Sequence, residues 1–216
     1  MHVLTTTRAL PTGELLELRL SSPSLRILHL GWCTHLQTLS LECTALTALF
    51  AYGCTRLSAP SLRCAVLGTL ELQKGGALDD ALVGALAAEA RQLESLNLTD
   101  CKLLREPRLA CEKLRILHLY NCVHLLSVTV LCPSLELLNL THSTALASLH
   151  IGCPKLGTLL CGGCKLLADA YVRVVVDACR ALHTCDVKGC ELLSEATLKA
   201  LEEQLSSRRQ AASMLI

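Results

Sequence analysis

Leucines recur along this 216-residue chain at a spacing that fixes how the backbone must run. The first Leu of each Leu-x-x-Leu-x-Leu unit, or of a degraded copy of it, falls at positions 15, 25, 36, 46, 57, 67, 93, 104, 114, 125, 135, 146, 156 and 182. Shorter and longer steps alternate and give a 21-residue period, and a single 26-residue step replaces a pair of them twice, from Leu67 to Leu93 and from Leu156 to Leu182. A fixed period of this length predicts an array in which each repeat packs on its neighbours.

A longer, 89-residue period relates the two halves of the array. The segment LRILHLGWCTHL at 25–36 recurs as LRILHLYNCVHL at 114–125. Full coils are predicted to begin at Leu25, Leu46, Leu67, Leu93, Leu114, Leu135, Leu156 and Leu182. Leu4 lies one 21-residue period before Leu25, so we expect residues 1–14 to form a degraded N-terminal coil, residues 15–205 the solenoid and residues 206–216 a C-terminal tail.

Each unit has the alternation of a β-strand, because its second and third leucines point inward while the third, fifth, seventh and eighth positions of the pattern LxxLxLxxC point outward. The ninth position, at a turn, is cysteine or a small residue: Cys33, Cys54, Gly75, Cys101, Cys122, Ser143, Cys164 and Cys190. The intervening units place a second line of cysteines on the other edge: Cys43, Cys64, Cys111, Cys132 and Cys153. These patterns predict an α/β leucine-rich-repeat solenoid, ribonuclease-inhibitor-like, whose 21-residue coils carry strands on both faces.

Helical patterning replaces the second strand in the two 26-residue coils, at 79–90 (DDALVGALAAEA) and 169–179 (DAYVRVVVDAC). Asp79 and Asp169 stand where an N-cap is expected. A third helix is expected at about 195–205, after Ser194 as N-cap, and its charged outer face is typical of a helix that caps the end of an array.

Residues 78–101 (LDDALVGALAAEARQLESLNLTDC) and 167–190 (LADAYVRVVVDACRALHTCDVKGC) each carry a helix, a leucine strand and a terminal Cys. They resemble the cysteine-containing leucine-rich repeats of F-box/leucine-rich-repeat proteins. The resemblance covers residues 15–205 and does not include an F-box motif. It implies a substrate-binding repeat domain, as found in SCF-type ubiquitin-ligase adaptors that dock a cullin-type ligase. Most coils depart from that family by carrying a strand on the outer side.

The composition excludes several other classes of protein. A formal net charge of +1, with no run of Lys or Arg, argues against binding to nucleic acid or to an anionic membrane. The mean hydropathy is +0.44, yet no stretch approaches the roughly 18 apolar residues of a membrane span. The first residues, 1–13, lack the apolar core expected of a signal peptide. A cytoplasmic protein, with the nucleus as the alternative, is expected. The sequons at Asn97 and Asn139 are then incidental.

The spacing of Cys161 and Cys164 matches that of a zinc knuckle or a redox pair. Because Cys164 holds the turn position and Cys161 replaces an inward Leu, we interpret both as packing residues and expect no metal and no cofactor. The chain lacks the sequences GxGxxG, HExxH and GxSxG and the Walker A motif. A duplicated array without a distinctive polar constellation indicates a protein that is not an enzyme. A cysteine-based metal or redox protein remains the third hypothesis.

Four of the five aromatic residues fall at outward strand or turn positions, and the fifth, Tyr171, falls in a predicted helix. Exposed aromatics gathered on one face are typical of a protein interface. The first predicted partner-binding patch contains Ile27, His29, Trp32, Phe50 and Tyr52. The second contains Ile116, His118, Tyr120 and Leu137. The sequence therefore predicts a non-enzymatic protein-binding domain, either the substrate-recognition part of a ligase adaptor or a free-standing scaffold.

Overall fold

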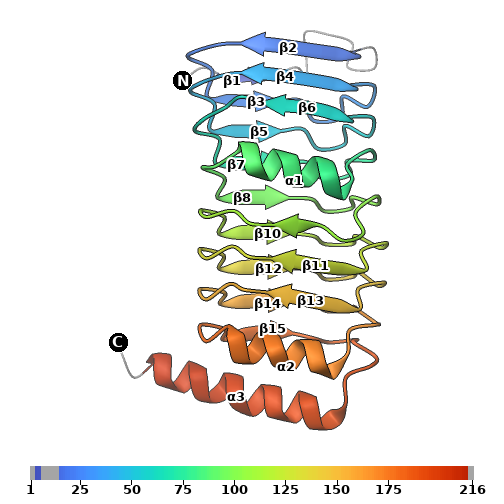
Figure 1. The fold of residues 1–216 in the computed structure, drawn as a ribbon, viewed down its shortest axis with the longest axis vertical. Coiled ribbons are helices and arrows are strands. Elements are labelled where there is room, and N and C mark those ends of the chain that lie inside the picture. The colour runs from blue at the N-terminus through green and yellow to red at the C-terminus, as the bar shows by residue number, and fades with distance from the viewer. Residues whose placement is uncertain (1–2, 6–14, 214–216) are drawn as a thin grey trace.

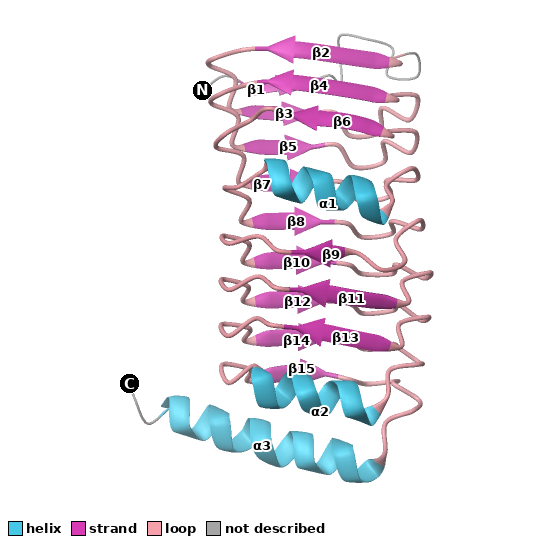
Figure 2. Ribbon diagram, in the orientation of Figure 1, coloured by secondary structure: helices cyan, strands magenta, loops and turns pink. Residues whose placement is uncertain are grey.

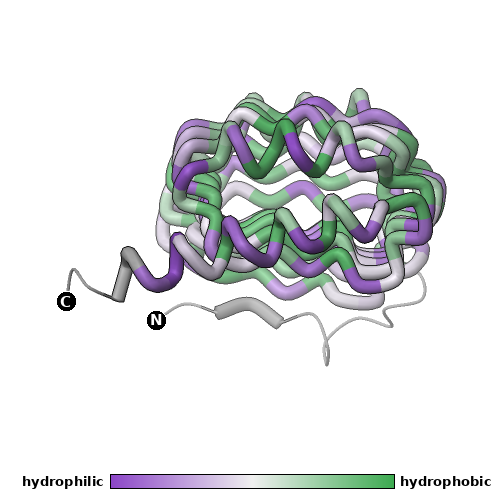
Figure 3. The backbone as a smooth tube through the Cα atoms, turned by 90° about the horizontal axis from the view of Figure 1, so that it is seen from below, coloured by the Kyte–Doolittle hydropathy of each residue, from purple (hydrophilic) through white to green (hydrophobic). Residues whose placement is uncertain are grey.

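The computed structural model describes residues 3–5 and 15–213, and it shows a solenoid of stacked, parallel strands (Figure 1). Viewed along the axis of the solenoid, the stacked coils have the outline of a flattened ring with two faces (Figure 3). Ile27 pairs with Ala48, one 21-residue coil further on, whereas Thr69 pairs with Ser95 across a 26-residue coil. The strand register thus confirms the predicted 21-residue period and the predicted 26-residue step.

One face of the solenoid is a continuous parallel sheet of nine strands. Each of the units predicted to open a full coil contributes one strand, and these strands follow chain order in the sheet. The strands are β1 (Val3–Thr5), β3 (Ile27–His29), β5 (Ala48–Phe50), β7 (Thr69–Glu71), β8 (Ser95–Asn97), β10 (Ile116–His118), β12 (Leu137–Asn139), β14 (Thr158–Leu160) and β15 (Thr184–Asp186).

The opposite face is divided into two three-stranded sheets (Figure 2). The first sheet contains β2 (Glu17–Ser21), β4 (Thr38–Glu42) and β6 (Ala59–Leu62). The second contains β9 (Arg108–Leu109), β11 (Ser127–Val130) and β13 (Ser148–Ile151). Helix α1 (Asp80–Glu89) lies between the two sheets and contacts β6 and β9, while α2 (Asp169–Ala178) follows β13. Strands on both faces and helices in the two longer coils confirm the predicted leucine-rich-repeat-like fold.

The core is a stack of leucines and cysteines between the two faces. Leu28 and Leu117, the central residues of β3 and β10, are 1% and 0% exposed, and the strand residues on either side of them face outward. Leucine removed from water contributes about 25 cal/mol per Å² of apolar surface. Stacked coils can therefore hold the solenoid together without any buried Phe, Tyr or Trp.

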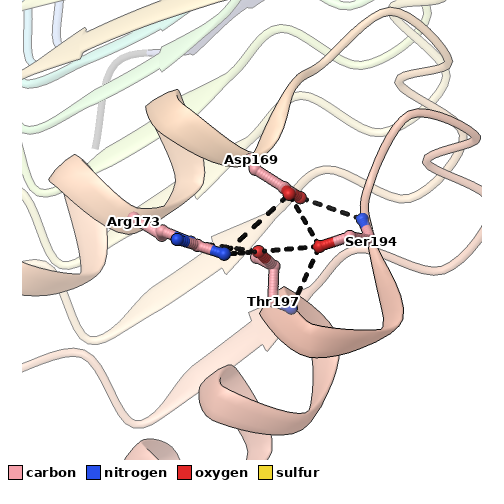
Figure 4. Close-up of polar contacts among 4 residues, drawn as sticks. All are labelled: Asp169, Arg173, Ser194 and Thr197. Atoms are coloured by element: carbon pink, nitrogen blue, oxygen red, sulfur yellow. Dashed lines mark hydrogen bonds and ion pairs between the residues drawn. The ribbon is translucent and has the colours of Figure 1, made fainter.

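The predicted N-caps of the two inner helices have different outcomes. The Asp79 carboxylate accepts a hydrogen bond from the Leu82 amide at 2.9 Å and caps α1, as predicted. The prediction for Asp169 was wrong, because Ala168 is the N-cap of α2. Asp169 lies inside the first turn, and its carboxylate reaches the following coil, where it accepts bonds from the Ser194 amide at 2.9 Å and the Ser194 hydroxyl at 2.7 Å (Figure 4).

Helix α3 (Glu195–Ser213) covers the C-terminal end of the array (Figure 1). Ser194 is its N-cap, since the Ser194 hydroxyl accepts a bond from the Thr197 amide at 3.2 Å. The sequence predicted that this helix ends at about residue 205, but it continues to Ser213, so the predicted helix end is corrected. Arg208 explains the extension, because its guanidinium donates to the carbonyl oxygens of Val176, Cys179 and Leu182.

At the N-terminal end, β1 extends the nine-stranded sheet. Leu4 pairs with Leu28, and not with Leu25 as the 21-residue offset predicted. Leu4 therefore holds the second-leucine position of its coil. Residues 6–14 of the predicted degraded coil lie outside the described residues. Within 3–5 and 15–213, no helix has the length and apolar character needed to cross a membrane.

Candidate partner-binding surface

The outward residues of the nine-stranded sheet form columns that run along the solenoid. Parallel pairing in register places equivalent residues of neighbouring coils next to each other. The fifth position gives the column His29, Phe50, Glu71, Asn97, His118, Asn139, Leu160 and Asp186. Both predicted patches consequently lie on one face of the protein.

The eighth position of each coil, just beyond the strand, has a left-handed backbone. Three of these residues are glycine, but Trp32 (φ 64°), Lys74, Asp100, Asn121 and His142 are not. Their amides join neighbouring coils; that of Trp32, for example, donates to the Tyr52 carbonyl at 2.7 Å. A bulky residue at positive φ is an outlier that costs about 1–2 kcal/mol. Trp32 is also 54% exposed, so folding alone gives no reason for a tryptophan there.

Trp32 and Tyr52 interlock through two glycines. A β-carbon at Gly31 would collide with the Tyr52 ring, and one at Gly53 would collide with the Trp32 ring, so each ring lies across the backbone glycine of the other coil. The two ring centroids are 6.2 Å apart with an interplanar angle of 85°, and the Lys74 ammonium lies 5.0 Å from the Trp32 ring centroid. The two glycines hold this pair in a fixed arrangement.

A second ring pair adjoins the first. His29 and Phe50, register partners on β3 and β5, stack with ring centroids 4.5 Å apart and an interplanar angle of 6°. Ile27 is the outward neighbour of His29 on the same strand and is half-buried. We name Ile27, His29, Trp32, Phe50, Tyr52 and Lys74 the N-terminal aromatic cluster. It contains the whole first predicted patch and adds Lys74.

The second predicted patch is divided by the structure. Tyr120 is 36% exposed and meets His142 edge-on, with ring centroids 5.5 Å apart and an interplanar angle of 78°. Sequence reasoning missed His142, although it holds the same coil position as Trp32. His118 is half-buried at the centre of the face. Tyr120 and His142 are named the central aromatic pair.

Ile116 and Leu137 lie at the other end of their strands and line a separate groove. The groove has a volume of about 480 Å³ and is bounded by Ile116, Glu136, Leu137, Lys155, Gly157, Thr158, Ala181 and His183. Glu136 on the groove wall forms a bidentate ion pair with Arg115, at 3.0 Å for both contacts. The apolar and aromatic members of the second patch therefore face different parts of the surface.

Polar residues of the face are engaged in local backbone contacts. Asn97, Asn139 and Asp186, all at the fifth position, accept bonds from amides two residues on, at 3.1, 3.0 and 3.0 Å. This Asx geometry closes the turn that follows each strand. It gives the asparagines of both sequons a structural role. Asp100 accepts a bond from the Asn121 side chain on the next coil.

The cysteines are also structural donors. All fourteen are in the thiol form, outside any disulfide bond, and every one except Cys185 is buried. Along the turn edge, Cys54, Cys122 and Cys164 donate through sulfur to carbonyl oxygens of the preceding coil at 3.1, 3.3 and 3.1 Å. Burial raises the pKa of Cys54 and of Cys122 to about 12. These thiols remain protonated at neutral pH and bridge successive coils.

Cys161 and Cys164, the CxxC pair, occupy the positions that the repeat assigns to them. Both are buried, and the pKa of Cys161 lies well above the ordinary thiol value because of its hydrogen bond with Cys164 and its complete burial. No group of three or more His, Cys, Asp or Glu side chains that could hold a metal ion occurs within residues 3–5 and 15–213. The contacts of this pair are those of packing and hydrogen bonding.

A scan against models of known protein families finds no match for the chain, and a search of curated proteins finds no sequence that matches it. The leucine-rich-repeat-like fold is therefore supported by the repeat and the geometry alone. A solenoid of this kind presents one extended surface, and such surfaces are generally suited to binding proteins.

Proposed function

We propose that this chain is a non-enzymatic protein-binding repeat domain whose partner docks on the nine-stranded sheet face. The observation that carries the proposal is Trp32, a bulky and exposed side chain at a left-handed turn position that three other coils fill with glycine. Backbone strain is typically retained where function requires it. Tryptophan and tyrosine also dominate the binding energy of protein interfaces. Both features favour the N-terminal aromatic cluster as the main contact.

The test is an affinity pull-down from cell extract, scored by mass spectrometry. Wild type is compared with a variant in which Phe50, Tyr52 and Tyr120 are replaced by alanine. The matched control is Tyr171→Ala, which removes the aromatic residue of α2 that meets His150 away from this face. We expect a set of partners that the control retains and the triple variant loses. Equal recovery with all three proteins, each shown to be folded by circular dichroism, would refute the proposal.

A finer proposal is that the domain is the substrate-recognition part of an SCF-type ubiquitin-ligase adaptor. Support comes from the resemblance of residues 78–101 and 167–190 to F-box/leucine-rich-repeat sequences. Both segments contain a helix followed by a strand of the sheet, namely α1 with β8 and α2 with β15. Recovery of a cullin adaptor in the same pull-down is expected. Partners without ligase components would instead identify a scaffold.

A further inference from the structure

We propose that the partner segment bound by this face is basic, with one Lys or Arg at the N-terminal aromatic cluster beside Glu71 and a second at the central aromatic pair beside Asp100. The inference rests on the proposed function and names the chemical class of the partner. It follows from three observations: a cation already bound by the cluster, the placement of the carboxylates, and the distance between the two aromatic sites.

The first observation is the contact between Lys74 and Trp32. The ammonium lies 5.0 Å from the ring centroid, within the roughly 6 Å reach of a cation–π interaction. Lys74 comes from the third coil and Trp32 from the first, so this contact joins two coils that are not direct neighbours in the sheet. An internal cation thus occupies part of the surface that a partner cation would use. The indole, 54% exposed, still offers area to a second cation.

The second observation is the position of the carboxylates. Glu71 is the register neighbour of Phe50, and the Asp100 amide donates to the Tyr120 carbonyl at 2.9 Å. Each aromatic site thus has one half-buried carboxylate on an adjoining coil. From β3 to the turn after β12, the outward columns contain one further charged residue besides histidines, which is Lys74. Aromatic faces flanked by carboxylates are complementary to Arg and Lys.

The third observation is the spacing. The Trp32–Tyr52 pair spans the first two coils and the Tyr120–His142 pair spans the fifth and sixth, so the sites are four strand spacings apart. At about 4.8 Å per strand this separation is about 19 Å. An extended peptide rises about 3.3 Å per residue and covers the distance in about six residues. Since six is even, both basic side chains would point to the same side of such a peptide.

The test uses the full chain and a synthetic probe. Trp32 is the single tryptophan of the protein, so its emission reports directly on the N-terminal aromatic cluster. The probe is a Ser/Thr peptide that carries two arginines six positions apart. Control peptides have the same composition with adjacent arginines, or glutamate in place of arginine. We expect the spaced arginine peptide to bind most tightly, with the affinity falling as salt is added.

Variants of the protein give effects of opposite sign. Glu71→Gln and Asp100→Asn should each weaken binding of the spaced peptide about twofold to fivefold, the size expected for one charge pair at the protein surface. Lys74→Asn removes the competing cation, keeps a residue that tolerates the left-handed backbone, and should tighten binding by a similar factor. Glu42→Gln on the opposite face is the matched control and should change nothing. Tighter binding of the glutamate peptide, weaker binding by Lys74→Asn, or no spacing preference would overturn the inference.

The two proposals fail in distinguishable ways. If the pull-down partners depend on Phe50, Tyr52 and Tyr120 while the arginine peptides show no preference, the face binds protein and only the basic class is wrong. If the triple variant retains every partner, the face itself is wrong, whatever the peptides do.

Discussion

Asp80 and Asp169 hold equivalent positions in the two helical coils, and both carboxylates leave their own helix to bind the chain that follows. Asp80 accepts bonds from the amides of Arg105 and Glu106 at 3.0 and 2.8 Å. Asp169 accepts two bonds from Ser194, the residue equivalent to Arg105 (Figure 4). After the anchored residue Arg105 the chain forms strand β9, whereas after Ser194 it forms helix α3. The same anchor therefore serves two different continuations of the array.

The residues that follow Arg105 and Ser194 determine whether the chain forms a strand or a helix. Leu109 and Cys111 are two residues apart and both buried, which is the period of a strand. Thr197, Leu201 and Leu205 are four residues apart and buried, which is the period of a helix face. In α3 a serine also supplies the N-cap that an arginine at position 105 cannot supply. Duplication copied the coil and its anchor, while local patterning determined whether the array continues or is capped.

The largest expected effect compares Leu28 with Leu117, the equivalent core leucines of the two halves. Replacing either with alanine leaves a cavity and should cost about 2–5 kcal/mol in the free energy of unfolding. Leu117→Ala should cost more, because coils near the end of a solenoid open locally at lower cost. Chemical denaturation of both variants measures the difference. A larger loss for Leu28→Ala would contradict this order.

The C-terminus of α2 differs from that of α1 in its contact with Arg208 of helix α3. Its guanidinium satisfies three carbonyl oxygens around the C-terminus of α2, at 2.8 to 3.2 Å. Arg208→Ala should lower the free energy of unfolding by about 1–3 kcal/mol, the range for hydrogen bonds made by a charged group. Arg209→Ala, next in sequence, is the control and should have little effect. Hydrogen exchange should show the loss of protection in α2 and α3 and unchanged protection in α1.

Cys54 and Ser143 compare sulfur with oxygen at equivalent turn positions. Cys54 donates to the Leu30 carbonyl at 3.1 Å, and the Ser143 hydroxyl donates to the Leu119 carbonyl at 2.9 Å. Ser143→Ala should cost about 1–2 kcal/mol in the free energy of unfolding, because it leaves a buried acceptor without its stronger donor. Cys54→Ala should cost about 1 kcal/mol or less, since a thiol is a weak donor. Thermal unfolding of the two variants gives the comparison, and equal costs would mean that the donors are equivalent.

The smallest effect is local and depends on pH. The hydroxyl and amide of Ser194 hold the pKa of Asp169 below its ordinary value. A carboxyl with a lowered folded-state pKa stabilises the folded form fully above about pH 3.9, its unfolded value, and loses that effect as the pH falls through the lower folded-state pKa. We expect the first turn of α3 to lose protection from hydrogen exchange in that acidic range. Asp169→Asn should remove this pH dependence of the protection in α3. Asp80→Asn, the control, should leave the pH dependence in α3 unchanged.

Much of this architecture could be predicted from the leucine period, because inward strand positions repeat whenever coils stack. The features that the sequence missed depend on contacts between coils. Asp169 resembles an N-cap locally, and its true partner lies in the next coil at Ser194. Residues 206–210 contain no apolar side chain to mark a helix, and Arg208 is held there by α2. His142 carries no motif, and only its coil position, shared with Trp32, indicated that it belongs to the surface.

The two lines of buried thiols have a practical consequence for the study of motion. A thiol whose pKa is about 12, such as that of Cys54, Cys101, Cys122 or Cys153, reacts with an alkylating reagent only when its coil opens to solvent. Most coils carry at least one buried cysteine, so the labelling rate of each cysteine reports how often its own coil opens. Mass spectrometry of briefly alkylated protein would then measure how far each cysteine has reacted, and so show the order in which the coils of the native protein open to solvent.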